Sequence, residues 1–201
     1  MNIWTLLTLL FSFCMAFSIG ANDAANGLGT SYGTQAIPMW AIVSNGAMAE
    51  FVGAFFCSDK VSAVLTQNII KNINNIDVPT KERMMFSVCL ASFCFIMFSS
   101  FSGMPISGTH TVVGAMLGAG VAASTNNELN WAEIGTILLG WVISPILSCL
   151  IACGLMFMVA SLTMNTRDYS YRARILFLQF IIGLCAMVLI FILDKLFNRR
   201  L

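Results

Sequence analysis

The chain has 201 residues, of which 58% are hydrophobic and only 9% are charged, and its formal net charge is +1. Soluble domains usually carry about 25% charged residues, so the chain lacks the polar surface that a water-soluble globule needs. We therefore expect an all-α, multi-pass integral membrane protein that contacts a lipid bilayer. A net charge so close to zero argues against nucleic acid as a partner.

About 20 apolar residues cross a bilayer as a helix. On that scale the apolar runs predict about five transmembrane helices, near residues 3–20, 37–57, 83–101, 131–160 and 172–195. The first run resembles a secretory signal peptide, but it lacks a basic start and is followed directly by a polar motif. The fourth run is too long for one straight span, so we expect it to be tilted or broken near Pro145.

Two further segments have a mixed character. Residues 103–123 are apolar but rich in glycine and threonine, which predicts a re-entrant or broken helix. In residues 58–76 the apolar side chains recur on one side at helical spacing, which predicts an amphipathic helix at the membrane interface. Together with the spans, these segments predict one transmembrane domain over residues 1–201. Basic residues gather in more than one loop, so the positive-inside rule leaves the orientation open.

The string GANDAANGLGTSYG, residues 20–33, places an aspartate at membrane depth. A charge at mid-bilayer costs roughly 2.5–3.5 kcal/mol on insertion scales, and the nearest basic residue in the sequence is Lys60. A sodium ion or a proton is therefore the expected partner of Asp23. Asn22, Asp23 and Asn26 have helical spacing and offer hard oxygen ligands. Amide and small residues also pack membrane helices closely, but the carboxylate favours a cation site.

Glycines surround both of the acidic residues that lie inside apolar runs. In residues 20–33 they permit the helix to unwind, which would offer backbone carbonyls as further cation ligands. In the second run, Glu50 lies between Gly46 and Gly53 at helical spacing. Its carboxylate should therefore face a closely packed neighbour. We favour a proton-linked or gating role over a protonated glutamate that only stabilises the helix bundle.

A second polar cluster is the string PISGTHT, residues 105–111. Its hydrogen-bonding side chains are Ser107, Thr109, His110 and Thr111. Pro105 favours the first turn of a helix, and a helix that begins inside the membrane directs its free N–H groups at an anion. His110 could add a pH-dependent hydrogen bond, although a lone histidine is more often structural. The hydroxyl groups could instead bond back to their own helix.

Cation ligands on one glycine-rich segment and anion donors on another indicate a cation-coupled anion transporter with discontinuous helices. The seven cysteines all lie in apolar runs and form no CxxC pair, so we expect no metal cluster. No GxSxG, HExxH or P-loop string is present, so we expect no enzymatic activity. The coupling ion is the only cofactor that the sequence predicts.

The strings GANDAANGLGTSYG and GMPISGTHTVVGAMLGAG, within segments 20–33 and 103–120, resemble the two signatures of the PiT family of inorganic phosphate transporters. These are sodium- or proton-coupled phosphate symporters. The string WAEIGTILLGWVISPILSCLI is similar to the family's helix with a tryptophan and a Ser-Pro pair. The resemblance implies an inverted-repeat fold that holds phosphate and cations between two halves. It implies cation binding by Asn22, Asp23 and Asn26, phosphate binding by Ser107, Thr109, Thr111 and His110, and an essential but unassigned role for Glu50.

The family pattern contains two such halves, and this sequence contains one. The chain could pair with a second polypeptide that supplies the other half, or form an antiparallel homodimer. It could also be a structural, non-transporting subunit of a larger complex. The presence of Asp23, Glu50 and the 105–111 cluster argues against the last alternative, because these groups are costly in a membrane. The sequence does not distinguish sodium from protons, or name the membrane.

Overall fold

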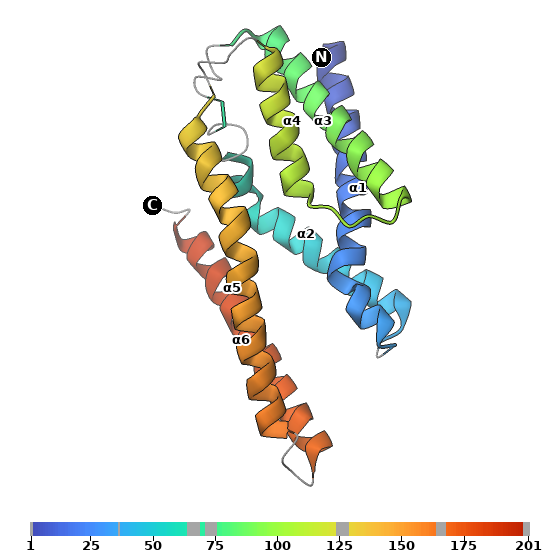
Figure 1. Cartoon of the computed structure of the whole chain (residues 1–201), viewed down its shortest axis with the longest axis vertical. Coiled ribbons are helices and arrows are strands. Elements are labelled where there is room, and N and C mark those ends of the chain that lie inside the picture. The colour runs from blue at the N-terminus through green and yellow to red at the C-terminus, as the bar shows by residue number, and fades with distance from the viewer. Residues whose placement is uncertain are drawn as a thin grey trace. The chain divides into compact units, whose positions relative to one another are not determined.

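The computed structural model describes residues 2–35, 37–63, 69–70, 76–123, 129–163 and 168–198. Within these ranges the regular structure is six α-helices and one isolated bridge between Ile70 and Leu129 (Figure 1). The helices are α1 (Ile3–Gly33), α2 (Met39–Ala63), α3 (Val78–Phe101), α4 (Gly108–Ala122), α5 (Trp131–Thr163) and α6 (Tyr169–Asn198). The all-α fold class predicted from the sequence is confirmed.

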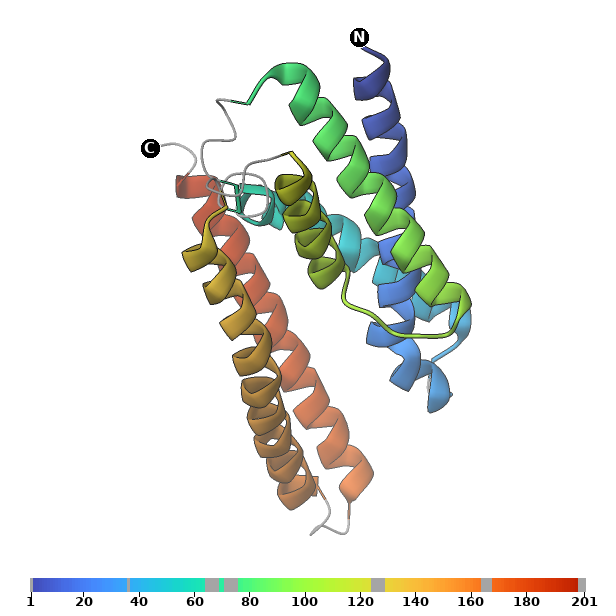
Figure 2. The same cartoon turned by 45° about the horizontal axis from the view of Figure 1, so that its top comes forward.

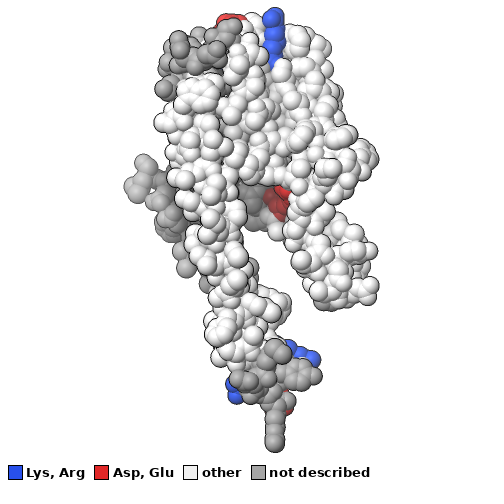
Figure 3. All heavy atoms as spheres, viewed as in Figure 1, with Lys and Arg blue, Asp and Glu red and all other residues white. Residues whose placement is uncertain are grey.

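Four helices in the described part of the chain, α1, α2, α3 and α5, are long and apolar enough to cross a membrane. The fifth expected span, residues 172–195, falls within α6, many of whose side chains lie outside the described part. Helix α4 has 15 residues, or about 22 Å of helix, which is shorter than a hydrocarbon core of about 30 Å. Figure 3 shows a broad uncharged surface along the helices, as contact with lipid requires. The protein is an integral, multi-pass membrane protein.

The chain divides into two compact units, Met1–Ile134 and Gly135–Leu201. Helix α5 continues through Pro145 without interruption, so of the tilt or break expected for this run the break is not found. Membrane helices tolerate proline because neighbouring groups satisfy the freed backbone carbonyl. The single transmembrane domain over residues 1–201 stays a prediction.

The contact between α1 and α3 forms the core of the first unit, where these two helices run side by side (Figures 1 and 2). The buried residues of α3 recur mostly every three or four positions: Met84, Val88, Cys89, Ser92, Ile96 and Ser99. Toward the N-terminal ends, the Phe11 ring centroid lies 5.5 Å from that of Phe86 and 6.1 Å from that of Phe93. Ser18 and Ser92 are fully buried, and such small residues let membrane helices approach closely.

The C-terminal half of α4 is held by apolar contacts. The buried residues of the whole helix are Val113, Met116 and Gly120. A Cβ on Gly120 would lie 2.9 Å from Leu129 Cδ2 and 3.5 Å from Ile70 Cδ1, so glycine permits this close approach. Ile69 and Ile70 are fully buried, and the Asn130 N–H donates to the Ile69 carbonyl at 2.9 Å.

The amphipathic helix predicted for residues 58–76 is described only in part. Residues 58–63 continue α2, and Ile69 and Ile70 are the buried residues just described. Residues 64–68 and 71–75 lie outside the described part of the chain. The interfacial helix therefore stays a prediction.

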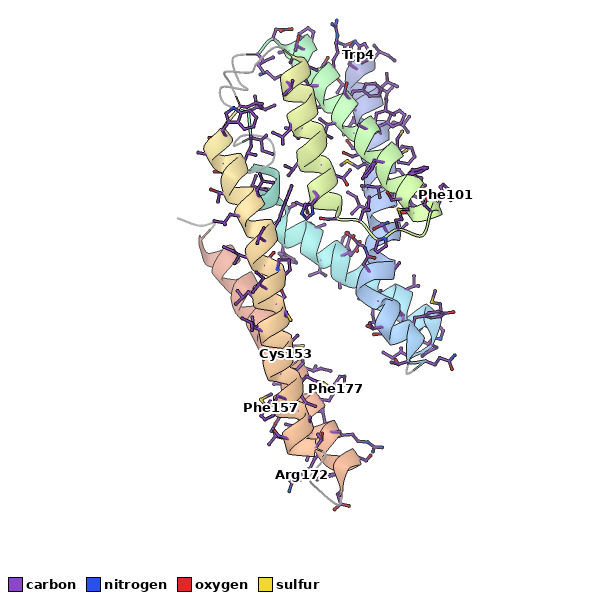
Figure 4. The ribbon with its side chains drawn as sticks, in the orientation of Figure 1. Trp4, Phe101, Cys153, Phe157, Arg172 and Phe177 are labelled. Atoms are coloured by element: carbon purple, nitrogen blue, oxygen red, sulfur yellow. The ribbon has the colours of Figure 1, made fainter. Side chains whose placement is uncertain are left out.

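The second unit contains most of α5 together with α6. Leu162 of α5 lines a small cavity of about 150 Å³ with Arg172 and Ile175 of α6, so the two helices adjoin near their connection. Phe157 and Phe177 are exposed on this unit (Figure 4). Exposed aromatic and aliphatic side chains of this kind suit a lipid-facing or partner-facing surface.

Candidate functional site

The polar string of residues 20–33 forms the C-terminal half of α1, which is one continuous helix over Ile3–Gly33. The prediction that the helix unwinds at its glycines is therefore wrong. Three alanines favour the helix here, and the Asn26 Nδ2 donates a hydrogen bond to Asn22 Oδ1, one turn earlier, at 3.1 Å. The backbone carbonyls of this segment stay engaged within the helix instead of being offered to a cation.

Asp23 and Glu50 line the same cavity, of about 550 Å³, between α1 and α2. A Cβ on Gly20 would lie 3.5 Å from Glu50 Oε2, so the glutamate carboxylate rests directly against α1. A Cβ on Gly46 would lie 2.6 Å from Leu28 Cδ1, which shows how closely the two helices cross. We call this space the acidic cavity. None of its described lining residues is basic.

Asp23 is half-buried, and its carboxylate lies beside the Asn26 side chain. Asn26 is not among the residues that line the acidic cavity, so of the three predicted cation ligands only Asp23 lines it. Two carboxylates in one partly desolvated cavity repel each other when both are ionised. A bound cation or a shared proton removes that repulsion. The sequence placed Asp23 and Glu50 in separate helices and gave no signal that they share a cavity.

Asn22 is 6% exposed and lies on a different side of α1. Its Nδ2 donates to Ser100 Oγ at 3.0 Å and to the Met104 carbonyl at 3.4 Å. Its Oδ1 accepts from the Ile106 N–H at 3.3 Å and from the Asn26 amide at 3.1 Å. An asparagine amide has two donor and two acceptor positions, so all four are used by the chain. Asn22 lines a second cavity, of about 300 Å³, and does not line the acidic cavity.

Helix α3 ends in a tight turn that sends the chain back toward α1. Gly103 has φ +68°, which favours glycine because it has no Cβ. The Met104 N–H donates to the Ser99 carbonyl at 2.9 Å, and the Gly103 N–H donates to the Ser100 carbonyl at 3.2 Å. This pair of bonds is a Schellman motif. It brings Met104 into reach of Asn22.

Helix α4 begins at Gly108, three residues after Pro105, so the proline precedes the helix and does not occupy its first turn. Ser107 is the N-cap, and its Oγ accepts a hydrogen bond from the His110 N–H at 3.3 Å. A Cβ on Gly108 would lie 3.3 Å from Ile19 Cγ2, so the start of α4 packs closely on α1. The short intramembrane helix therefore starts beside the polar half of α1.

A groove of about 670 Å³ lies along α3 and the first two turns of α4. Its polar lining residues are Ser107, His110 and Thr111. The Thr111 hydroxyl donates to the Ser107 carbonyl at 3.0 Å, whereas the Ser107 hydroxyl accepts from the backbone and keeps its own proton to donate. The first N–H groups of a helix have no intrahelical acceptor. In α4 the His110 N–H is taken by the Ser107 hydroxyl and the Thr111 N–H by the Ser107 carbonyl, which leaves the N–H groups of Gly108 and Thr109 and the Ser107 hydroxyl proton as the donors for an oxyanion.

Thr109 does not line this groove, although it belongs to the same predicted phosphate-binding set. Its side chain is exposed. Two residues along a helix correspond to about 200° of rotation, so Thr109 and Thr111 of α4 point to nearly opposite sides. The structure thus brings together three of the four predicted phosphate-side residues.

Membrane-crossing helices, one half-length helix and polar groups at membrane depth define a multi-pass membrane protein of the transporter class. Residues 19–199 match the phosphate transporter family, and the chain belongs to that family. The predicted resemblance to inorganic phosphate transporters is confirmed. Membership of a transporter family also points away from an enzyme.

A Thermococcus kodakarensis protein named as a phosphate permease is 30% identical over 190 residues, which cover 94% of this chain and 46% of that protein. The Arabidopsis thaliana protein "Inorganic phosphate transporter 2-1, chloroplastic" is 35% identical over 149 residues, which cover 72% of this chain and 25% of that protein. A solved structure, "The sodium-dependent phosphate transporter", is similar with a TM-score of 0.79 and 29% identity, over 85% of this chain and 42% of that one. The chain thus spans less than half the length of these relatives.

Proposed function

We propose that the chain takes part in cation-coupled symport of inorganic phosphate across a membrane. The acidic cavity carries the proposal, because two carboxylates, Asp23 and Glu50, line it within membrane-spanning helices. A carboxylate at such a depth needs a partner, and no basic residue is among the described residues around the cavity. A sodium ion or a proton supplies the missing charge. Family membership supports phosphate as the transported anion.

In this proposal Asp23 and Asn26 bind the cation, and Glu50 shares its charge or carries a proton. Asn22 adds its carbonyl oxygen only in a state in which it has released its present hydrogen bonds. Phosphate binds at the start of α4, through the Ser107 hydroxyl and the first backbone N–H groups. The remaining phosphate-side groups are Thr109, His110 and Thr111.

The chain spans less than half the length of its relatives, so we propose that it works as one half of a two-repeat assembly. The other half is a second polypeptide or a second, antiparallel copy of this chain. Native mass spectrometry of the purified complex distinguishes these arrangements. A mass of twice the chain indicates the homodimer, and any other additional mass indicates a different partner.

Uptake of radiolabelled phosphate into vesicles that contain the purified complex tests the function. We expect uptake above that of empty vesicles when an inward sodium or proton gradient is imposed, and a competing effect of excess unlabelled phosphate. Parallel samples with each gradient alone identify the coupling ion. Uptake at the level of empty vesicles under both gradients would contradict transport and would favour a structural subunit.

A further inference from the structure

We infer that Asn22 is a positioning residue that couples the acidic cavity to the start of α4, an inference that rests on the proposed function. Its hydrogen bonds join α1 to the turn that precedes α4. That turn carries Ser107 and the first N–H groups of α4. Asn22 therefore controls the geometry of the anion donors without itself contacting the anion.

The orientation of the Asn22 amide is fixed by its partners. The Ile106 N–H can only donate, so the amide oxygen must face it. The Met104 carbonyl can only accept, so the amide nitrogen must face that side. Rotating the amide by half a turn would oppose donor to donor and acceptor to acceptor. Breaking any one of these bonds in a site that is 6% exposed leaves a buried polar group unpaired.

Asn26 links this amide to the cation side of α1. At about 100° per residue, Asn26 lies between Asn22 and Asp23 around the helix. Its Nδ2 donates to Asn22 Oδ1 at 3.1 Å, and its side chain lies beside Asp23. The Asn26 amide nitrogen also donates to the Asp23 carboxylate, so a cation that takes up the charge of Asp23 weakens that bond and lets the same nitrogen donate more strongly to Asn22. Cation binding thereby favours the arrangement in which Asn22 holds Ile106.

The two ends of α4 differ in the way they are held. Its C-terminal half is buried against Ile70 and Leu129 through Gly120. Its N-terminal end packs on Ile19 through Gly108 and also follows a turn that is tied to α1 by two hydrogen bonds, one that Asn22 donates to the Met104 carbonyl and one that it accepts from the Ile106 N–H. The N-terminal end is therefore the end that a cation can regulate.

Hydrogen–deuterium exchange of the full chain in lipid nanodiscs tests the inference without requiring transport. The exchange rate of residues 104–110 is compared between sodium chloride and choline chloride. We expect Asn22→Ala to exchange about three- to tenfold faster there than the wild type, the effect of losing hydrogen bonds worth roughly 0.5–1.5 kcal/mol each. Ser100→Ala removes one of the four bonds and should give a smaller increase, about twofold. Asn45→Ala is the matched control, because the Asn45 amide donates only within α2, to the Ala41 carbonyl.

The sodium response separates positioning from simple structural support. In the wild type, sodium should slow exchange over residues 104–110, and this response should disappear in Asn22→Ala. Asp23→Asn should also lose the sodium response but keep the slow exchange of the wild type in choline. Equal exchange of wild type, Asn22→Ala and Ser100→Ala in choline would overturn the inference. No sodium response in the wild type together with fast exchange in Asn22→Ala has a different meaning: it excludes sodium as the coupling ion of the proposed function and supports the positioning role of Asn22.

Discussion

Helix α1 has two faces that consist of different residues and have different roles. Toward α3 it places aromatic rings and the buried Ser18 and Asn22, which pack or bond in fixed positions. Toward α2 it places Gly20 and Asp23, which line an open cavity with Glu50. At about 100° per residue these two sets fall on nearly opposite sides of one helix. The packed face therefore fixes α1 in place, whereas the glycine-lined face leaves room for an ion.

The largest effect is expected from Asp23→Asn, on the face toward α2. Cation-driven phosphate uptake should fall about 10- to 100-fold, since a hydrogen bond to a charged group contributes about 1.5–3 kcal/mol. The melting temperature should not fall, because a neutral amide is less costly in a membrane than a carboxylate. Uptake and a melting curve on one preparation check both parts. Wild-type uptake in this variant would remove Asp23 from the mechanism.

Glu50→Gln should reduce uptake about tenfold, in line with the smaller end of the charged hydrogen-bond range. Glutamine fits the space against Gly20, so the change removes charge and little else. Glu82→Gln is the matched control, because Glu82 accepts from Asn2 and Thr5 on the side of α1 that faces α3. Equal losses of uptake in the two variants would abolish the distinction between the faces.

Phe11→Ala tests the packed face. Two edge-to-face ring contacts are lost, each worth about 0.5–1.5 kcal/mol beyond the loss of buried area, so the free energy of unfolding should fall by at least about 1–3 kcal/mol. The cation dependence of uptake should stay that of the wild type in the molecules that remain folded. Thermal unfolding in detergent and uptake at several sodium concentrations give the two measurements. A changed cation dependence would show that the packed face also takes part in coupling.

The smallest effect concerns Asp77, the N-cap of α3. Hydrogen bonds from Thr80, first from its side chain and then from its backbone N–H, hold the pKa of Asp77 below its ordinary value of 3.8. A lowered pKa in the folded state means that the cap contributes stability above about pH 4, and that this contribution is lost as pH falls through the lowered pKa. The melting temperature of Asp77→Ala should therefore be slightly below that of the wild type at pH 6, and the gap should narrow near pH 3. Asp77→Asn should keep the same small advantage over Asp77→Ala at both pH values, since asparagine is an equally good N-cap.

Much of the helical framework could be predicted from sequence because it depends on apolar run length alone. The glycine and threonine content of residues 103–123 predicts a re-entrant or broken helix, and the structure has a 15-residue helix there; its re-entry into the membrane stays a prediction. The continuity of α1 could not be predicted in this way. Glycines near Asp23 permit unwinding, but the Asn26–Asn22 bond and the alanines hold the helix. Local composition could not weigh those two tendencies.

The residues of the candidate site could be proposed from the sequence, whereas their arrangement in space could not. The signal at Asp23 came from the cost of a charge in a membrane, which needs no knowledge of neighbours. The shared cavity with Glu50 depends on how α1 and α2 cross. The spacing of Gly46 and Gly53 around Glu50 predicted a closely packed neighbour but not that this neighbour is α1. Thr109 was grouped with Ser107 because both are hydroxyl residues, but their side chains diverge once the start of α4 is known.

Equilibrium binding of radiolabelled phosphate to the wild type and to Asp23→Asn tests the central claim most directly. Binding is measured once with and without sodium at constant pH, and once at several pH values without sodium. If the face of α1 toward α2 holds the coupling cation, one of these cations raises phosphate affinity in the wild type and has no such effect in Asp23→Asn. Phosphate binding with the same cation dependence in both proteins would contradict the claim.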